Sequence, residues 1–363
     1  MNKTKILSLL SAIIFAILVV LIILILLGKN PFDFLVVLFT AFFHDENGNM
    51  ISNFFQQISP LIFAAIGVAF AFKTGLFNIG AEGQVTLGIL GALVVGYIPN
   101  IPVFIHLPLV LLSGFIFGAF WGFIPGVLKA YFKVHEVVIT IMLNYIALYL
   151  VKDTFFPIFG NPATTNRETL ALADSLTFKN LAGLKILRIP VNFWIYFLFA
   201  LLAVGVFYFI IYKTKFGYEI RAGGLNSDAA DYAGIKSKKN MMLAMMISGG
   251  FAGIGGAVYL LMIGTIATNG FELTNIGFDG LAASLLGSST PIGVLFGSTI
   301  LTYLNVISLE IQQVLIVPKE ITSMIVALIL FFIAMSYMFE KFWDKRLQKS
   351  EKKQPKNRKE DVV

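Results

Sequence analysis

A short motif that carries a carboxylate occurs twice in the sequence. Residues 78–83 are Asn-Ile-Gly-Ala-Glu-Gly, and residues 275–280 are Asn-Ile-Gly-Phe-Asp-Gly, each beside long apolar runs. A carboxylate near apolar segments is costly unless it faces a helix bundle or water, so Glu82 and Asp279 are candidates for a solute or ion pathway. A helix beginning at these glycines would offer free N–H groups to an anion. The alternative is that each carboxylate caps its own helix.

The first copy of the motif has polar neighbours that could share the same role. Asn78 opens the motif and Gln84 follows it directly. Both side chains can donate and accept hydrogen bonds. We therefore include Asn78 and Gln84 with the two carboxylates among the candidate pathway residues.

A second polar group lies in the apolar segment that follows residue 135. Glu136, Thr140 and Asn144 are four residues apart, so a helix places them on one face. Such a stripe can line a translocation pathway. It can equally join helices through hydrogen bonds, which are worth about 0.6 kcal/mol each in a membrane. The sequence leaves both interpretations open.

The sequence lacks the residue patterns of zinc, thiol, ATP-binding and serine-nucleophile sites. His135-Glu136 is followed by Ile139 where a zinc protease needs a second histidine, and there is no cysteine. His44 and His106 fall in predicted external segments and are interpreted as ordinary polar loop residues. Neither a phosphate-binding P-loop nor a Gly-x-Ser-x-Gly nucleophile motif occurs. We expect no enzyme activity and no cofactor, so energy must come from a partner or an ion gradient.

The composition is that of an integral membrane protein. Hydrophobic residues make up 58% of the chain and charged residues 13%, whereas soluble domains carry about 25% charged residues. Apolar runs of about 20 residues can cross a bilayer as helices. The sequence predicts an all-α protein with about ten transmembrane helices, at 7–28, 55–72, 80–97, 107–128, 136–151, 191–212, 240–264, 276–288, 291–308 and 321–340. The eighth is short enough to be a half-helix, and 31–43 is expected to lie at the membrane interface.

The placement of basic residues predicts the orientation. With both termini in the cytoplasm, the internal segments hold 20 of the 27 Lys and Arg residues, as the positive-inside rule requires. The apolar run up to Leu27 is longer than a signal peptide core, so we expect a retained first span. The predicted external loop is 152–190. The basic tail 341–363 is expected to be disordered near anionic lipid, not an arm that binds nucleic acid.

The repeated motif also predicts an internal symmetry. In this topology the first copy is cytoplasmic and the second is external. That inversion is expected if spans 2–5 and 7–10 are repeats related by an axis in the membrane plane.

The longest internal loop, 213–239, contains a predicted helix at about 225–235. Asn226 and Ser227 are good helix-capping residues, and good helix formers follow them. A short helix fixed to a span on each side is a natural docking surface for another protein. The alternative is a plain amphipathic connector.

At these residues the chain resembles the permease family of ABC importers for ribose, branched-chain amino acids and nucleosides. The resemblance covers about 55–340 and is strongest at 73–84, 121–150, 216–235 and 277–293. The runs GLFNIGAEGQ and HEVVITIMLNYIALYL resemble the nucleoside branch. On this resemblance, 1–340 form a transmembrane permease domain in the plasma membrane.

The resemblance implies four partners and a coupling loop. The partners are a second related permease, a cytoplasmic ATPase with two nucleotide-binding domains, an external lipid-anchored binding protein and a nucleoside. In this family the loop matching 217–235 sits in a groove of the ATPase, which implies a coupling role for Gly217, Arg221, Leu225, Asn226, Ala229, Ala230, Tyr232, Ala233 and Gly234. Gly223-Gly224 departs from the family, where one position usually holds a larger apolar residue. We expect this pair to loosen the approach to the coupling helix.

Two other function classes are considered. An ion-coupled secondary transporter of a small polar solute would use Glu82 or Asp279 as its coupling site. That class leaves the predicted docking helix unexplained. A membrane-embedded enzyme would need a nucleophile, a metal set or a cofactor loop that the sequence does not offer.

Overall fold

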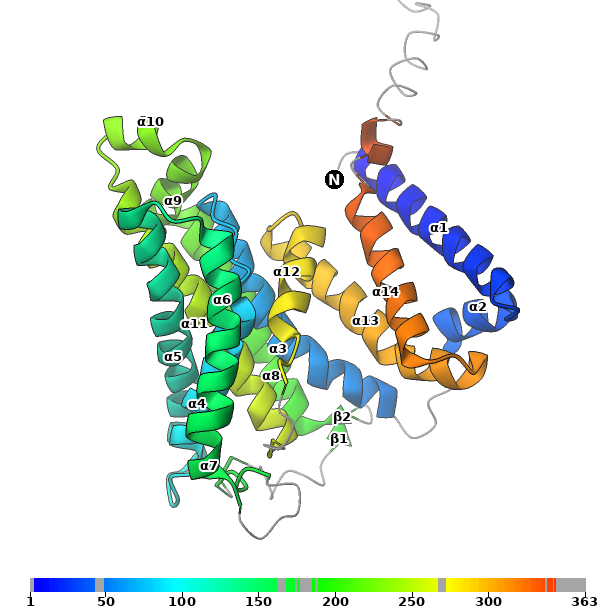
Figure 1. Cartoon of the computed structure of the whole chain (residues 1–363), viewed down its shortest axis with the longest axis horizontal. Coiled ribbons are helices and arrows are strands. Elements are labelled where there is room, and N and C mark those ends of the chain that lie inside the picture. Colours follow the sequence, from blue (N-terminus) through cyan, green and yellow to red (C-terminus); the bar gives the residue numbers. More distant parts are fainter. Residues whose placement is uncertain are drawn as a thin grey trace, which may run out of the picture. The chain divides into compact units, whose positions relative to one another are not determined.

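The computed structural model is built almost entirely of helices (Figure 1). It describes residues 3–42, 49–161, 168–173, 175–176, 185–186, 189–266, 272–336, 338–341 and 343. The elements are α1 (Lys3–Leu26), α2 (Pro31–Thr40), α3 (Asn49–Lys73), α4 (Ala81–Gly96), α5 (Val103–Phe132), α6 (Glu136–Tyr149), a π-helical turn η1 (Leu150–Phe155), α7 (Phe156–Phe159), β1 (Lys185–Ile186), β2 (Ile189–Pro190), α8 (Val191–Lys213), α9 (Lys215–Leu225), α10 (Ser227–Tyr232), α11 (Ser237–Ile263), α12 (Ile276–Leu286), α13 (Pro291–Leu315) and α14 (Lys319–Ala334).

The chain divides into two compact units. The first comprises Met1–Ala41 and Ile307–Val363, and the second is Phe42–Val306. In the first unit α1 packs along α14, where the rings of Phe15 and Phe332 meet edge to face with centroids 4.9 Å apart. In the second unit α3, α4 and α5 surround α11. All residues discussed below as a functional site belong to this second unit.

Six helical segments in the described part of the chain are long and apolar enough to cross a membrane. They are Met50–Lys73, Val103–Phe132, Glu136–Phe159, Val191–Lys213, Ser237–Ile263 and Pro291–Leu315. Shorter apolar helices are Leu10–Leu26, Pro31–Thr40, Ala81–Gly96 and Ile276–Leu286. A helix of 11 residues spans about 16 Å, so α12 is a half-helix as the sequence predicts. The protein is a multi-pass membrane protein, and the count of ten crossings stays a prediction.

Small residues let the central helices approach at backbone distance. A Cβ added at Gly253 of α11 would lie 2.9 Å from the Cα of Gly118 and would also meet the carbonyl oxygen of Gly114. Both partners lie on α5, one turn apart. Close approach through glycines four residues apart is a common way for membrane helices to pack, because lipid supplies no hydrophobic force between them. These contacts hold the core of the second unit together.

Two expectations are corrected by the helices. The helical segment that begins at Glu136 continues to Phe159, beyond the predicted end at residue 151, because backbone hydrogen bonding does not stop where the apolar run stops. His106 is a buried residue of α5, with its ring nitrogens 2.8 Å from the Ser175 hydroxyl and 3.0 Å from the Val95 carbonyl oxygen. It is therefore not a loop residue. His44, much of loop 152–190 and all of the tail 341–363 except two residues lie outside the described residues.

Candidate functional site

Glu82, in the first turn of α4, binds the beginning of α12. One carboxylate oxygen accepts hydrogen bonds from the Thr274 hydroxyl at 2.8 Å and the Asn275 N–H at 2.9 Å. The other oxygen accepts from the Gly277 N–H at 2.7 Å. A helix N-terminus leaves its first N–H groups without partners and attracts negative charge. Glu82 therefore caps α12, not its own helix.

The two copies of the motif meet at this contact. Gly277 lies so close to the backbone of Ala81 and Glu82 that a Cβ on it would overlap their atoms. The expected placement of the copies on opposite faces of the membrane is wrong, because hydrogen-bonded groups lie at the same depth. The pairing could not be inferred from the sequence, since nearly 200 residues separate the partners.

The polar residues of the first copy form a buried network. The Asn78 side-chain N–H₂ group donates to the side-chain amide oxygen of Gln84 at 2.9 Å and to the Ser248 hydroxyl of α11 at 2.8 Å. Its carbonyl oxygen accepts from the Gly80 N–H at 3.0 Å. Buried polar groups satisfied in this way rigidify their surroundings. The network fixes the start of α4 against α11.

The stripe on α6 also contacts the start of α4. The Asn144 side chain accepts from the Gly83 N–H at 2.8 Å and donates to the Ile79 carbonyl oxygen at 3.0 Å. Thr140 donates to the carbonyl oxygen of Glu136, whose carboxylate lies 2.7 Å from the Lys129 ammonium. The Asn144 and Glu136 contacts favour the interhelical alternative for the stripe, whereas the Thr140 bond stays within α6. A pathway role for its three members stays a prediction.

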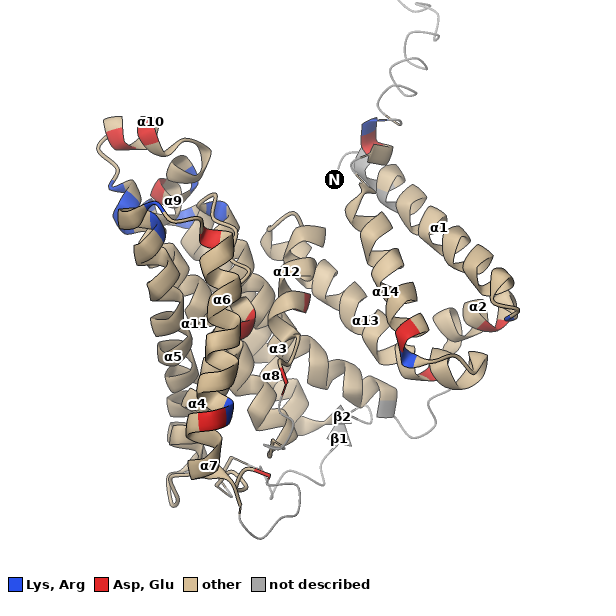
Figure 2. Ribbon diagram, in the orientation of Figure 1, with Lys and Arg blue, Asp and Glu red and all other residues tan. Residues whose placement is uncertain are grey.

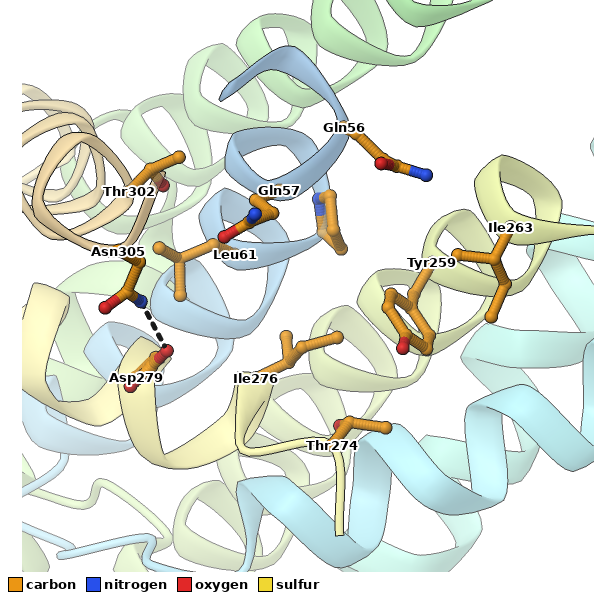
Figure 3. A pocket seen from close by; sticks show the side chains of 11 residues that line it. Gln56, Gln57, Leu61, Tyr259, Ile263, Thr274, Ile276, Asp279, Thr302 and Asn305 are labelled. Carbon is orange, nitrogen blue, oxygen red and sulfur yellow. Dashed lines mark hydrogen bonds between the residues drawn. The ribbon is translucent and has the colours of Figure 1, made fainter. Parts of the chain in front are cut away.

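A cavity of about 350 Å³ opens beside Asp279 (Figure 3). Its walls come from α3, α11, α12, α13 and the segment before α12. The lining residues are Gln56, Gln57, Pro60, Leu61, Tyr259, Ile263, Thr274, Ile276, Asp279, Thr302 and Asn305. The Asn305 side-chain N–H₂ group donates to one carboxylate oxygen of Asp279 at 3.1 Å. Thr274 joins this wall to Glu82 behind it.

Of the predicted pathway residues, only Asp279 lines this cavity. Gln57, Tyr259, Thr302 and Asn305 also line it and were not predicted from the sequence. A signal for two of them exists: Thr302 and Asn305 are three residues apart in an apolar predicted span, which is the same pattern that identified the stripe on α6. Gln57 stands at the edge of a span, and nothing in its local sequence separates it from an interface residue.

The loop between α8 and α11 folds as two helices. Thr214 caps α9 by accepting from the Gly217 N–H, and Asn226 caps α10 by accepting from the N–H groups of Asp228 and Ala229. The cap at Asn226 is confirmed, although α10 is shorter than the predicted helix. Lys and Arg residues gather around α9 and the neighbouring helix ends (Figure 2).

The outer surface of these two helices is apolar in places. Leu225 is 90% exposed and Tyr232 is 95% exposed, while Ala230 is buried against the rest of the loop. Asp231 accepts from the Ser237 N–H at 3.1 Å, and hydrogen bonding from Ser237 lowers the pKa of that carboxyl group. This bond ties α10 to the first turn of α11. The loop therefore presents a fixed surface.

The expectation that Gly223-Gly224 loosens the approach to the coupling helix is wrong for Gly224. Gly224 packs directly against the backbone of Lys73, Thr74 and Gly75, where a Cβ would lie 2.9 Å from the Thr74 carbonyl carbon. A side chain at residue 224 would push α9 away from the turn after α3. The glycine tightens the approach to α10 because it allows backbone contact.

The class of protein follows from a family comparison. Residues 50–335 match the model of the branched-chain amino acid transport system permease component. The chain belongs to this family and is a permease component of an ABC importer. Membership of this class implies an ATPase partner and a paired permease.

Individual relatives give a finer picture. The chain is 41% identical to the guanosine ABC transporter permease protein NupP of Bacillus subtilis over 283 residues. The aligned region covers 78% of this chain and 80% of that protein. It is 35% identical over 345 residues to the nucleoside ABC transporter permease protein NupB of Lactococcus lactis, covering 93% of each. It is 28% identical to the glucose ABC transporter permease protein TsgB13 of Haloferax volcanii, over 87% of this chain and 83% of that one. No solved structure matches the chain significantly.

Proposed function

We propose that this permease carries nucleosides across the plasma membrane while a separate subunit hydrolyses ATP. The observation that carries the proposal is the 35% identity over 93% of both chains to a nucleoside permease. The cavity supports the same solute class, because its volume of about 350 Å³ falls within the range of small-molecule sites, roughly 300–1,000 Å³. Its lining combines polar side chains with an aromatic ring, which suits a solute that joins a sugar to a base.

Within this proposal the candidate residues have two kinds of role. Asp279 faces the solute in the cavity. Glu82 holds the half-helix α12, which carries Asp279, through three hydrogen bonds. Asn78, Gln84 and Asn144 hold the start of α4 through hydrogen bonds, so they act on the pathway through Glu82. Glu136 and Thr140 act in the same way by placing α6, Glu136 through its ion pair with Lys129.

The topology belongs to the same proposal. We propose about ten membrane segments with both termini in the cytoplasm, residues 1–340 as the membrane domain and an inverted repeat of spans 2–5 and 7–10. Among these segments, α4 and α12 are half-helices whose motif copies meet inside the membrane. From the contact at Glu82, α4 and α12 extend toward opposite ends of the view in Figure 1, as half-helices related by an axis in the membrane plane would do. The basic residues around α9 support a cytoplasmic location for that end under the positive-inside rule (Figure 2).

The partners follow from the importer class. We propose that the paired permease is a distinct, related chain, that the ATPase carries two nucleotide-binding domains and that a lipid-anchored binding protein delivers the solute from outside. Closure of the ATPase would move α9 and α10, and rocking of the membrane helices would then switch access from outward to inward.

Uptake measurements test the solute. Cells that express the whole transporter should accumulate labelled nucleosides, and excess unlabelled nucleoside should compete far better than ribose or a free base. Equal competition by ribose would overturn the nucleoside assignment. The purified chain alone in liposomes should accumulate no nucleoside under a proton or sodium gradient. Gradient-driven uptake there would support the ion-coupled alternative.

The coupling surface has its own test. Ala233 is exposed directly after α10, next to the exposed ring of Tyr232. Ala233→Asp places a charge on the proposed contact, and an unpaired charge in an interface costs on the order of several kcal/mol. We expect less ATPase to copurify, or hydrolysis to lose its coupling to uptake. Ala233→Ser, small and uncharged, is the control. Full copurification with normal uptake in Ala233→Asp would show that coupling uses another surface.

A further inference from the structure

The cavity in the second unit has two chemically different ends (Figure 3). At one end α12 and α13 contribute Asp279, Thr302 and Asn305. At the other end α11 contributes Tyr259 and Ile263. A solute with a hydrogen-bonding end and a flat end therefore suits the cavity. The inference that follows rests on the proposed nucleoside transport and specifies how the solute is held.

The Thr302 hydroxyl needs a partner that the described residues do not supply. Thr302 is 1% exposed, it lines the cavity, and its hydroxyl oxygen has no hydrogen-bond partner among the described residues. A buried hydroxyl without a partner is destabilising, so such groups are few in native proteins. Because Thr302 lines a cavity, a solute that enters the cavity is the candidate partner for this hydroxyl.

The neighbouring carboxylate determines which solute groups fit there. Asp279, when ionised, only accepts hydrogen bonds, and Asn305 holds it in position by donating to one of its oxygens at 3.1 Å. A group that donates is required opposite it. Sugar hydroxyls can donate to the carboxylate and also exchange hydrogen bonds with a threonine hydroxyl. Carboxylates bind ribose hydroxyls in the same way in nucleotide-binding folds.

We infer that Asp279 and Thr302 hydrogen-bond the ribose hydroxyls of the nucleoside during transport, with the base against the Tyr259 ring. Every base has a flat face that can stack on an aromatic side chain, so this end accepts different bases. The polar end discriminates, because a 2′-deoxyribonucleoside leaves a buried hydrogen-bonding group unpaired. The permease thus selects ribonucleosides over 2′-deoxyribonucleosides at this site.

Thr302→Val gives the sharpest test, since it removes the hydroxyl and keeps the shape. In the whole transporter we measure uptake of a labelled ribonucleoside and its 2′-deoxy counterpart in competition. The preference for the ribonucleoside should fall on the order of tenfold, because a site that hydrogen-bonds a substrate hydroxyl rejects the analogue that lacks it. Every variant is assayed in the same complex, so any preference of the other subunits cancels. Thermal stability should be unchanged or higher, because the hydroxyl has no hydrogen bond to the described residues that it could lose.

The chain offers a matched control one turn away on α13. The Ser298 hydroxyl is fully buried and also lacks a partner among the described residues, but Ser298 does not line the cavity. Ser298→Ala should leave the ribonucleoside preference unchanged. An equal change in Ser298→Ala and Thr302→Val would overturn the inference, because it would show an indirect effect of α13.

The remaining outcomes separate the two proposals. Unchanged preference in a folded Thr302→Val transporter overturns the ribose site and leaves nucleoside transport standing. Absence of nucleoside uptake by the wild-type transporter overturns the proposed function itself. If Thr302→Val does not fold, Asp279→Asn in the same assay must lower the preference, and Thr302→Ser, which keeps a hydroxyl, must retain it.

Discussion

Glu82 and Asp279 stand at the same position of a repeated motif, but their carboxylates have different partners. Glu82 is completely buried and accepts three hydrogen bonds from the segment that begins α12. Asp279 accepts one from Asn305 and lines a cavity. The first carboxylate is therefore placed to hold a helix, and the second to meet a solute.

The surroundings of the two helices explain the difference. Almost every residue of α4 is buried, because α5, α6, α11 and α12 pack around it. α12 is packed on α3 and α4, while Ile276 and Asp279 lie along the cavity. A motif can set where a helix begins, but the packing around that helix determines what its first-turn carboxylate can reach.

The glycines of the two copies should give the largest difference. A Cβ at Gly277 would overlap the Glu82 backbone, whereas a Cβ at Gly80 would first meet the Thr140 Cβ at 3.0 Å. We expect Gly277→Ala to cost about 3 kcal/mol of stability, because rigid backbone cannot move aside. Gly80→Ala, the matched variant, should cost less. Thermal unfolding in detergent measures both. Equal losses would contradict a special contact at Gly277.

Exchanging the two carboxylates for amides should separate stability from transport. Glu82→Gln keeps a single acceptor oxygen for three donors, so we expect a loss of about 2 kcal/mol in unfolding free energy. Asp279→Asn can still accept from Asn305, so we expect normal stability with reduced uptake. Unfolding and uptake are measured on the same preparations. A larger stability loss in Asp279→Asn would reverse the assignment of roles.

Asn144, which holds the start of α4, and Asn305, which holds Asp279, should show the same separation of stability from transport with smaller effects. Asn144→Leu leaves the Gly83 N–H and the Ile79 carbonyl oxygen without their bonds, which costs about 1 kcal/mol on the scale of membrane hydrogen bonds. Uptake should fall only as far as the amount of folded permease falls. Asn305→Leu should reduce uptake further than folded yield, because Asn305 lines the cavity. If Asn144→Leu instead spares the yield and abolishes uptake, its pathway role is supported.

The smallest effect is expected at the start of the second copy. Asn275 has a left-handed backbone (φ 64°) and makes no side-chain cap, so Asn275→Gly should change stability by less than about 0.5 kcal/mol. The N–H that Glu82 binds is retained. Asn78→Gly, at the equivalent position, removes the bonds to Gln84, Ser248 and Gly80 and should be clearly destabilising. Similar stabilities for the two glycine variants would show that the copies are equivalent after all.

Local patterns predicted much of the fold correctly. The apolar runs identified the six long apolar helices, the length of 276–288 identified a half-helix, and Asn226 identified the start of α10. Each of these features depends on residues within one or two helical turns. The buried position of His106 was missed, because its partners Ser175 and Val95 lie on other segments.

The site itself was predicted only in part. Asp279 was found because a carboxylate among apolar residues is conspicuous, but the cap that Glu82 provides to α12 was not. Gln57, Tyr259 and Thr302 come from three helices that are far apart in the chain, and their common cavity exists only once those helices pack. The glycines that allow this packing are visible in the sequence, although their partners are not.

The sequence by itself determined that this chain is a helical membrane protein of the ABC permease family. Composition, apolar length and family motifs are properties of the chain that do not depend on which segments meet. The tertiary structure alone decided that the two motifs touch, that Glu82 holds α12 and that Asp279 faces a cavity with Thr302. The physical reason is that a half-helix in a membrane must have its free N–H groups bound by protein, and only the packed structure determines which side chain binds them.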